Sequence, residues 1–237
     1  MERCWYKIKG ITGKTIDGVL TYPAKKKLTT KPTIIIFMHG LLDSMQSYII
    51  RNTSQELAKI GYTTFIYNQY GIYSSGLNFS TLSLNSLVAD MDIVIDHFTN
   101  KGFSMILVGH SFGCFVGLMS KHQQIPKILL EPSIHPSEFR NSISKKSTIT
   151  KPTLDFDIGR IEINHNFCKD MYSAPKYLNL LTYSPQVYLV ISSSRKEYWN
   201  VYSNIEHLKF TFIPTDHWFT NTNIVPIINT ILKKILR

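Results

Sequence analysis

The chain has 237 residues, of which 43% are hydrophobic and 12% aromatic, so it is long and apolar enough to fold around a substantial core. Its 26 Lys and Arg outnumber its 16 Asp and Glu, and its three cysteines, Cys4, Cys114 and Cys168, form no disulfide or metal-binding pattern. No apolar run reaches the roughly 18 residues of a membrane span, and the charged amino terminus is unlike a secretion signal. We therefore expect a cytoplasmic protein without a transmembrane segment.

The net charge of +10 is better explained by a basic solvated surface than by a nucleic-acid site. The Lys and Arg residues are scattered, with short runs only at 25–27, 145–146 and 233–234. No nucleic-acid-binding motif accompanies them. We expect no nucleic-acid partner, although a weak preference for anionic substrates stays open.

Strands and helices alternate along the chain. The first two segments of alternating apolar and polar residues, 4–10 and 15–22, predict an antiparallel strand pair. Apolar runs predict further strands at 32–38, 62–68, 105–109, 127–132, 186–192 and 209–214. Apolar residues at helical spacing predict helices at 44–60, 82–98, 112–121, 171–181, 198–208 and 223–236. This order predicts one α/β domain over residues 1–237, with a mostly parallel central sheet flanked by helices.

The alternation is interrupted after the sixth predicted strand. Residues 132–170 are polar and irregular, with clusters of Ser, Thr and Pro. Loops of this length are usually functional or disordered. We expect an insertion that covers the carboxyl edge of the sheet like a cap and supplies part of a substrate pocket.

Three short segments follow predicted parallel strands and are expected to meet at that edge. His39 and Gly40 follow the strand at 32–38, and His217 follows the strand at 209–214. Between the strand at 105–109 and the next helix, the chain reads Gly-His-Ser-Phe-Gly, with Ser111 between two glycines. The glycines remove side chains that would collide where strand meets helix, which leaves Ser111 projecting above the sheet. The segment is either a tight turn and nothing more or a strained elbow that holds Ser111 as a nucleophile.

These motifs resemble those of the α/β-hydrolases over nearly the whole chain, with a layout closest to small feruloyl or cinnamoyl esterases and monoacylglycerol-lipase-like enzymes. His39-Gly40 resembles the oxyanion loop of that family, residues 109–113 its nucleophile elbow, and 132–170 its cap. The loop at 68–76 keeps Gly71 and Ser75 of the family pattern. It departs from that pattern at Asn68, Tyr70 and Tyr73, where the family has Asp, Arg and Gly.

The resemblance implies a carboxylic ester hydrolase that forms an acyl-enzyme intermediate. Ser111 would be the nucleophile and His217 the general base, while the backbone amides of Leu41 and Phe112 would form the oxyanion hole. The expected partner is a small-molecule acyl ester, and the chemistry requires no cofactor or metal. The sequence does not determine the oligomeric state.

Other residues near these motifs have simpler interpretations. His110 and Cys114 flank the predicted elbow, and we interpret both as packing residues of the core. Trp218 and Phe219 either line an acyl pocket or pack in the core.

The acid that should orient His217 is the weakest part of the pattern. After the strand at 186–192 the family has Gly-x-x-Asp, whereas this chain reads Ser-Ser-Ser-Arg at 192–195. Glu197, two residues further on, is the favoured candidate, and Glu131 at the end of the strand at 127–132 is the alternative. Asp216 is expected to point away from the histidine ring. We accordingly expect Glu197→Gln to lower turnover more than Glu131→Gln, and little effect from either would indicate a Ser–His dyad or a chain that no longer catalyses well.

Two alternatives to an esterase stay open. The same machinery could serve an acyl-thioesterase, an acyltransferase or a peptidase. The missing acid is also compatible with a binding protein on a hydrolase scaffold that has lost catalysis.

Overall fold

An eight-stranded sheet forms the centre of the computed structural model, which describes residues 1–11, 13, 15–24, 32–70, 82–132, 153–156, 159–174 and 177–236. In spatial order, the strands are β1 (Glu2–Lys9), β2 (Thr15–Tyr22), β4 (Thr63–Tyr67), β3 (Thr33–Met38), β5 (Ser104–His110), β6 (Lys127–Leu130), β9 (Val187–Ser192) and β10 (Leu208–Ile213). β2 runs antiparallel to both of its neighbours, and all other pairs are parallel. The predicted α/β fold with a mostly parallel sheet is therefore confirmed.

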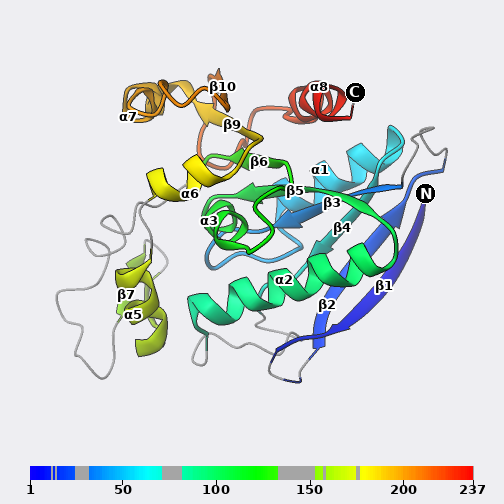
Figure 1. The fold of residues 1–237 in the computed structure, drawn as a ribbon, viewed down its shortest axis with the longest axis horizontal. Helices are drawn as coiled ribbons and strands as arrows, with labels where there is room; N and C mark the ends of the chain where they lie inside the picture. The colour runs from blue at the N-terminus through cyan, green and yellow to red at the C-terminus, as the bar shows by residue number, and fades with distance from the viewer. Residues whose placement is uncertain are drawn as a thin grey trace.

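Helices cover both faces of the sheet, as Figure 1 shows with α8 along the upper border and α2 along the lower. One face packs against α1 (Tyr48–Lys59) and α8 (Val225–Ile235), and the other against α2 (Leu84–Asn100) and α3 (Phe112–Met119). β3 illustrates why both faces are apolar. Ile34 and Ile36 belong to the core beneath α2, whereas Ile35 and Phe37 belong to the core beneath α1, because successive strand residues point to opposite faces.

Two predicted helices differ from the observed ones. The helix expected at 171–181 is divided into α5 (His165–Ser173) and α6 (Tyr177–Tyr183). The backbone is extended at Ala174, which precedes Pro175, because a residue before proline is driven out of the helical region. The helix expected at 198–208 is limited to α7 (Lys196–Asn200), after a short 3₁₀ turn, η1 (Ser193–Arg195). The hydroxyl of Ser203 donates to the carbonyl of Asn200, a local bond that competes with helix continuation.

The insertion after β6 is more regular than its composition predicts. β7 (Thr153–Phe156) and β8 (Gly159–Glu162) pair as an antiparallel hairpin, and α5 begins at His165, within the segment expected to be irregular. The amphipathic spacing of Phe167, Cys168 and Met171 buries one side of α5 against the main core. Residues 133–152 of the insertion, and the 71–81 loop that contains Gly71, Tyr73 and Ser75, lie outside the described residues.

No helix in the described part of the chain combines the length and the apolar character needed to cross a membrane.

Candidate active site

Ser111 lies at the sharp turn between β5 and α3, with φ 53° and ψ −120°. This left-handed φ is strained for a residue with a side chain, at a cost on the order of 1–3 kcal/mol. A Cβ atom on Gly113 would lie 2.6 Å from the carbonyl oxygen of His39, and one on Gly109 would lie 2.7 Å from the Cα atom of Cys114. Both positions therefore require glycine, as the elbow interpretation predicts.

His217 reaches Ser111 from the loop between β10 and α8. Its Nε2 atom lies 3.0 Å from the Ser111 Oγ atom, within the range for proton transfer. The ring is about one-third exposed, so its other edge can meet solvent or a leaving group. The structure thus brings together two residues that are 106 positions apart in the sequence.

Glu131 lies behind His217, immediately after β6. Its Oε2 atom is 3.8 Å from Nδ1 of His217 and 3.0 Å from the guanidinium of Arg195, and its Oε1 atom accepts a short hydrogen bond from the Ser192 backbone N–H. The residue is fully buried, with a left-handed φ of 43°. Burial, the largest influence, raises the pKa of Glu131, but the nearby His217 ring and the hydrogen bonds from Ser192 and Arg195 outweigh it and leave the pKa below its ordinary value.

Glu197, the acid favoured from the sequence, is not brought to His217. It lies exposed in the first turn of α7, and among the described residues no ion pair joins it to His217. The physical reason is that the chain turns into η1 and α7 directly after β9, which directs this part of the chain toward solvent. Asp216 accepts a hydrogen bond from the Thr220 N–H at 2.8 Å, so its carboxylate is also engaged elsewhere. The geometry moves the candidate acid to Glu131.

The predicted oxyanion donors are the N–H groups of Leu41 and Phe112. Phe112 is the first residue of α3, so its N–H has no partner within the helix. Within the described part of the chain, neither N–H donates a hydrogen bond to another group. The loop that carries Leu41 lies close to Ser111, since a Cβ atom on Gly40 would be 3.2 Å from the Cβ atom of Ser111.

A buried network holds this oxyanion loop in place. The Nδ1–H of His39 donates to the Gly40 carbonyl at 2.8 Å, and its Nε2 accepts from the Gln69 N–H at 3.0 Å. Tyr70, at the position where the resembled family has Arg, donates its hydroxyl to the same Gly40 carbonyl at 3.0 Å. Burial lowers the pKa of His39 to about 4, so the ring is neutral at pH 7, with the tautomer that these bonds require.

The residues around the elbow add two findings. Cys114 is fully buried, and burial raises the pKa of its thiol well above the ordinary value, consistent with a core residue. His110 is buried as expected, but its Nε2 atom also lies 2.9 Å from the His217 carbonyl oxygen. The sequence-based interpretation missed this bond because His110, at the end of β5, is 107 positions from His217 in the sequence.

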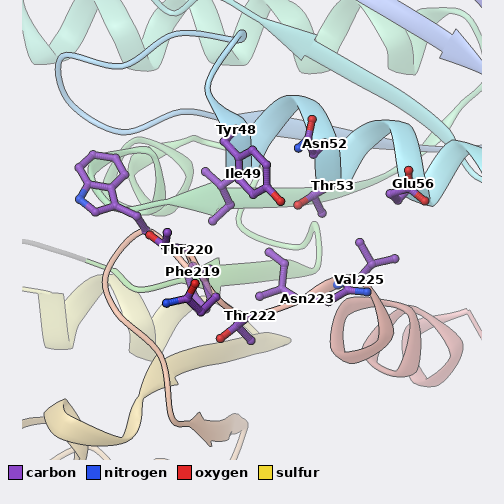
Figure 2. Close-up of a pocket in the computed structure, with 13 residues that line it drawn as sticks. Tyr48, Ile49, Asn52, Thr53, Glu56, Phe219, Thr220, Thr222, Asn223 and Val225 are labelled. Atoms are coloured by element: carbon purple, nitrogen blue, oxygen red, sulfur yellow. Dashed lines mark hydrogen bonds between the residues drawn. The ribbon is translucent and has the colours of Figure 1, made fainter.

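A groove of about 650 Å³ runs beside the His217 loop, between α1 and residues 218–225 (Figure 2). Tyr48 and Trp218 at its rim are more than half exposed, whereas Phe219 is buried in the core. The Trp218 ring lies 5.2 Å from the His217 ring, centre to centre. Neither Ser111 nor His217 lines the groove itself. Among the described residues, no group of three or more His, Cys, Asp and Glu side chains is arranged to hold a metal ion.

The sheet order, the helices on both faces and the elbow at Ser111 define the chain as an α/β-hydrolase. The model of the family described as serine aminopeptidase, S33, matches residues 30–149, just over half of the chain. The chain belongs to this family. No curated protein matches the sequence.

Solved structures share this fold at low sequence identity. Est1E from Butyrivibrio proteoclasticus, solved with ferulic acid bound, is similar with a TM-score of 0.79 and 17% identity, over 97% of each chain. The esterase domain of a Rhodothermus marinus protein has a TM-score of 0.71 and 14% identity, over 99% of this chain and 98% of that one. A serine hydrolase without a lid from Xanthomonas campestris has a TM-score of 0.68 and 14% identity, over 100% and 96%.

Proposed function

We propose that this protein is a serine hydrolase that cleaves carboxylic esters through an acyl-enzyme intermediate on Ser111. The observation that carries the proposal is the line of side chains from Ser111 through His217 to Glu131, with Ser111 on a strained turn. Such strain persists only where the surrounding structure enforces it, and it is typical of catalytic serines. The esterases among the similar structures support the ester as substrate class.

In the first half of the reaction, Ser111 Oγ attacks the ester carbonyl carbon while His217 Nε2 takes the hydroxyl proton. The tetrahedral intermediate collapses as its C–O bond to the alcohol breaks, and His217 gives the proton to the departing alcohol oxygen. In the second half, water attacks the acyl-enzyme by the same steps, and the carboxylic acid leaves. The N–H groups of Leu41 and Phe112 would stabilise the negative oxygen, with about 3 kcal/mol from each donor.

Glu131 would complete the triad. An ionised carboxylate behind His217 holds the Nδ1–H tautomer and stabilises the imidazolium that forms during the reaction. The 3.8 Å separation from Nδ1 is longer than a hydrogen bond, as is common for catalytic pairs in ligand-free enzymes. The low pKa of Glu131 supports this role because the group stays ionised at neutral pH.

The insertion at 132–170 would form one wall of the acyl pocket. The ring of Phe167 on α5 lies 5.8 Å from the ring of Phe112, the residue that follows the nucleophile. This contact supports a cap over the elbow, and the pocket would take a small-molecule acyl ester. A cytoplasmic location stays a prediction from the sequence.

A peptidase is the second candidate because the family is described by an aminopeptidase. The same triad can cleave an amide or a thioester. Which of these substrates an enzyme prefers depends on how it binds the leaving group and the terminus of the substrate. A binding protein that has lost catalysis is the third candidate.

A fluorophosphonate probe and a substrate panel test the proposal. The wild-type protein should be labelled on Ser111 and should hydrolyse short p-nitrophenyl esters faster than matched thioesters and aminoacyl p-nitroanilides. Ser111→Ala should lose both labelling and hydrolysis while keeping its circular dichroism spectrum. Labelling with preferred anilide cleavage would establish the peptidase instead, and absence of labelling would favour the binding protein.

A further inference from the structure

Arg195 contacts the carboxylate of Glu131 at Oε2, the same oxygen that faces His217. It ends η1, directly after β9, and its guanidinium lies 3.0 Å from Glu131 Oε2 and 3.1 Å from the Pro132 carbonyl oxygen. The guanidinium also lies 5.6 Å from the Tyr198 ring centre and 6.0 Å from that of Trp199. These contacts fix the orientation of the cation.

A fully buried carboxylate needs a compensating charge to stay ionised. The groups facing Glu131 are Arg195 from η1, His217 from the β10–α8 loop, His110 from β5 and Cys114 from α3. His110 and Cys114 are buried and uncharged at pH 7. Arg195 is therefore the one permanent cation among the described groups that face this carboxylate.

We propose that Arg195 is a positioning residue of the active site, which holds Glu131 ionised and keeps its Oε2 atom turned toward His217. The inference rests on the proposed function, since it assigns Arg195 a role in supporting the triad. It also gives a reason for an arginine at the end of η1, three residues after β9, where the resembled family has its acid. The acid is supplied by the neighbouring strand β6, and the position after β9 supplies the counter-charge.

Sharing one oxygen between two cationic groups has a chemical consequence. Arg195 and a protonated His217 would both draw on Glu131 Oε2. The positive charge of Arg195 therefore disfavours uptake of a further proton by the Glu131–His217 pair. Loss of that charge makes protonation of the pair easier. The acid limb of the pH profile, where activity falls as the pH decreases, should therefore move to higher pH.

The test measures the rate of Ser111 labelling by a fluorophosphonate as a function of pH. In Arg195→Met the midpoint of the acid limb should rise by about one pH unit or more. Arg195→Lys, which keeps the charge, should return the midpoint to near the wild-type value. Lys196→Met is the matched control, because Lys196 is the neighbouring exposed cation and contacts the Phe212 ring instead of Glu131.

Two further variants separate this role from a structural one. Arg195→Gln keeps a hydrogen-bond donor but loses the charge, so it should shift the limb like Arg195→Met even if the methionine variant folds poorly. In a Glu131→Gln background, adding Arg195→Gln should produce a smaller shift, because the part of the effect that runs through the carboxylate is absent. If Arg195→Met and Arg195→Gln are labelled and their acid limb stays at the wild-type midpoint, the role of Arg195 is overturned and the proposed function is not. A wild-type protein that is not labelled at all would overturn the proposed function together with this inference.

Discussion

The Nε2–H of buried His110 donates a hydrogen bond of 2.9 Å to the backbone carbonyl of His217. His110 directly precedes Ser111, the proposed nucleophile, so this bond ties the loop that carries His217, the proposed general base, to the turn that carries Ser111. Backbone anchoring of this kind sets the distance between Ser111 Oγ and His217 Nε2, which determines how well the proton is transferred.

The first prediction concerns this bond. His110→Phe removes the donor and should lower kcat for p-nitrophenyl ester hydrolysis about tenfold or more, with a smaller change in KM, because the base is positioned less well. His110→Gln keeps a donor near the same place and should retain more of the rate. Equal losses in both variants, accompanied by equal losses of thermal stability, would indicate that His110 serves packing only.

The second prediction concerns the acid. Glu131→Gln should lower kcat about a hundredfold or more, because the imidazolium of His217 loses its counter-charge. Glu197→Gln should leave kcat within about twofold of wild type, since Glu197 is exposed and unpaired with His217. This ranking reverses the one expected from the sequence. Steady-state kinetics of the two variants decide between Glu131, Glu197 and a Ser–His dyad.

The third prediction concerns stability at acid pH. Burial lowers the pKa of both His39 and His110 to about 4, whereas an unfolded histidine titrates near 6.5. Between these values the unfolded chain binds more protons than the native protein, so the free energy of unfolding falls as pH decreases from about 6.5 to about 4. Each histidine contributes on the order of 3 kcal/mol to this loss.

Urea unfolding at pH 7, 6 and 5 measures the effect. The wild-type protein should lose stability steadily across this range. His110→Phe should show a shallower dependence, because one of the two buried histidines is gone. A pH dependence that is unchanged in this variant would contradict the assignment for His110.

The fourth prediction concerns the oxyanion loop. Tyr70→Phe removes one of the three hydrogen bonds that the Gly40 carbonyl accepts, while the bonds from His39 and from the Asp43 N–H are retained. The loop should become less well ordered around Leu41, and kcat should fall several-fold with little change in KM. A change confined to KM would place Tyr70 in substrate binding instead.

Local sequence patterns were sufficient for much of the fold and for part of the candidate site. The continuous apolar run of β3, the helical spacing of α2 and the glycines around Ser111 are each determined by neighbours within a few residues. Such features follow from the backbone and side-chain preferences of a short segment. The expected meeting of Ser111 and His217 needed only the further rule that parallel strands end at a common edge.

The candidate acid was decided by the tertiary structure. β6 and β9 are sheet neighbours, with Leu130 opposite Val190, although about sixty residues of chain separate them. This register places Glu131 beside Ser192 and Arg195, whose N–H and guanidinium hold the carboxylate beneath His217. No local pattern encodes which strands become neighbours or in what register, because that choice is made by packing across the whole core. The sequence by itself therefore determined the elements and the turn that carries Ser111, whereas the pairing of β6 with β9 determined which carboxylate lies beside His217.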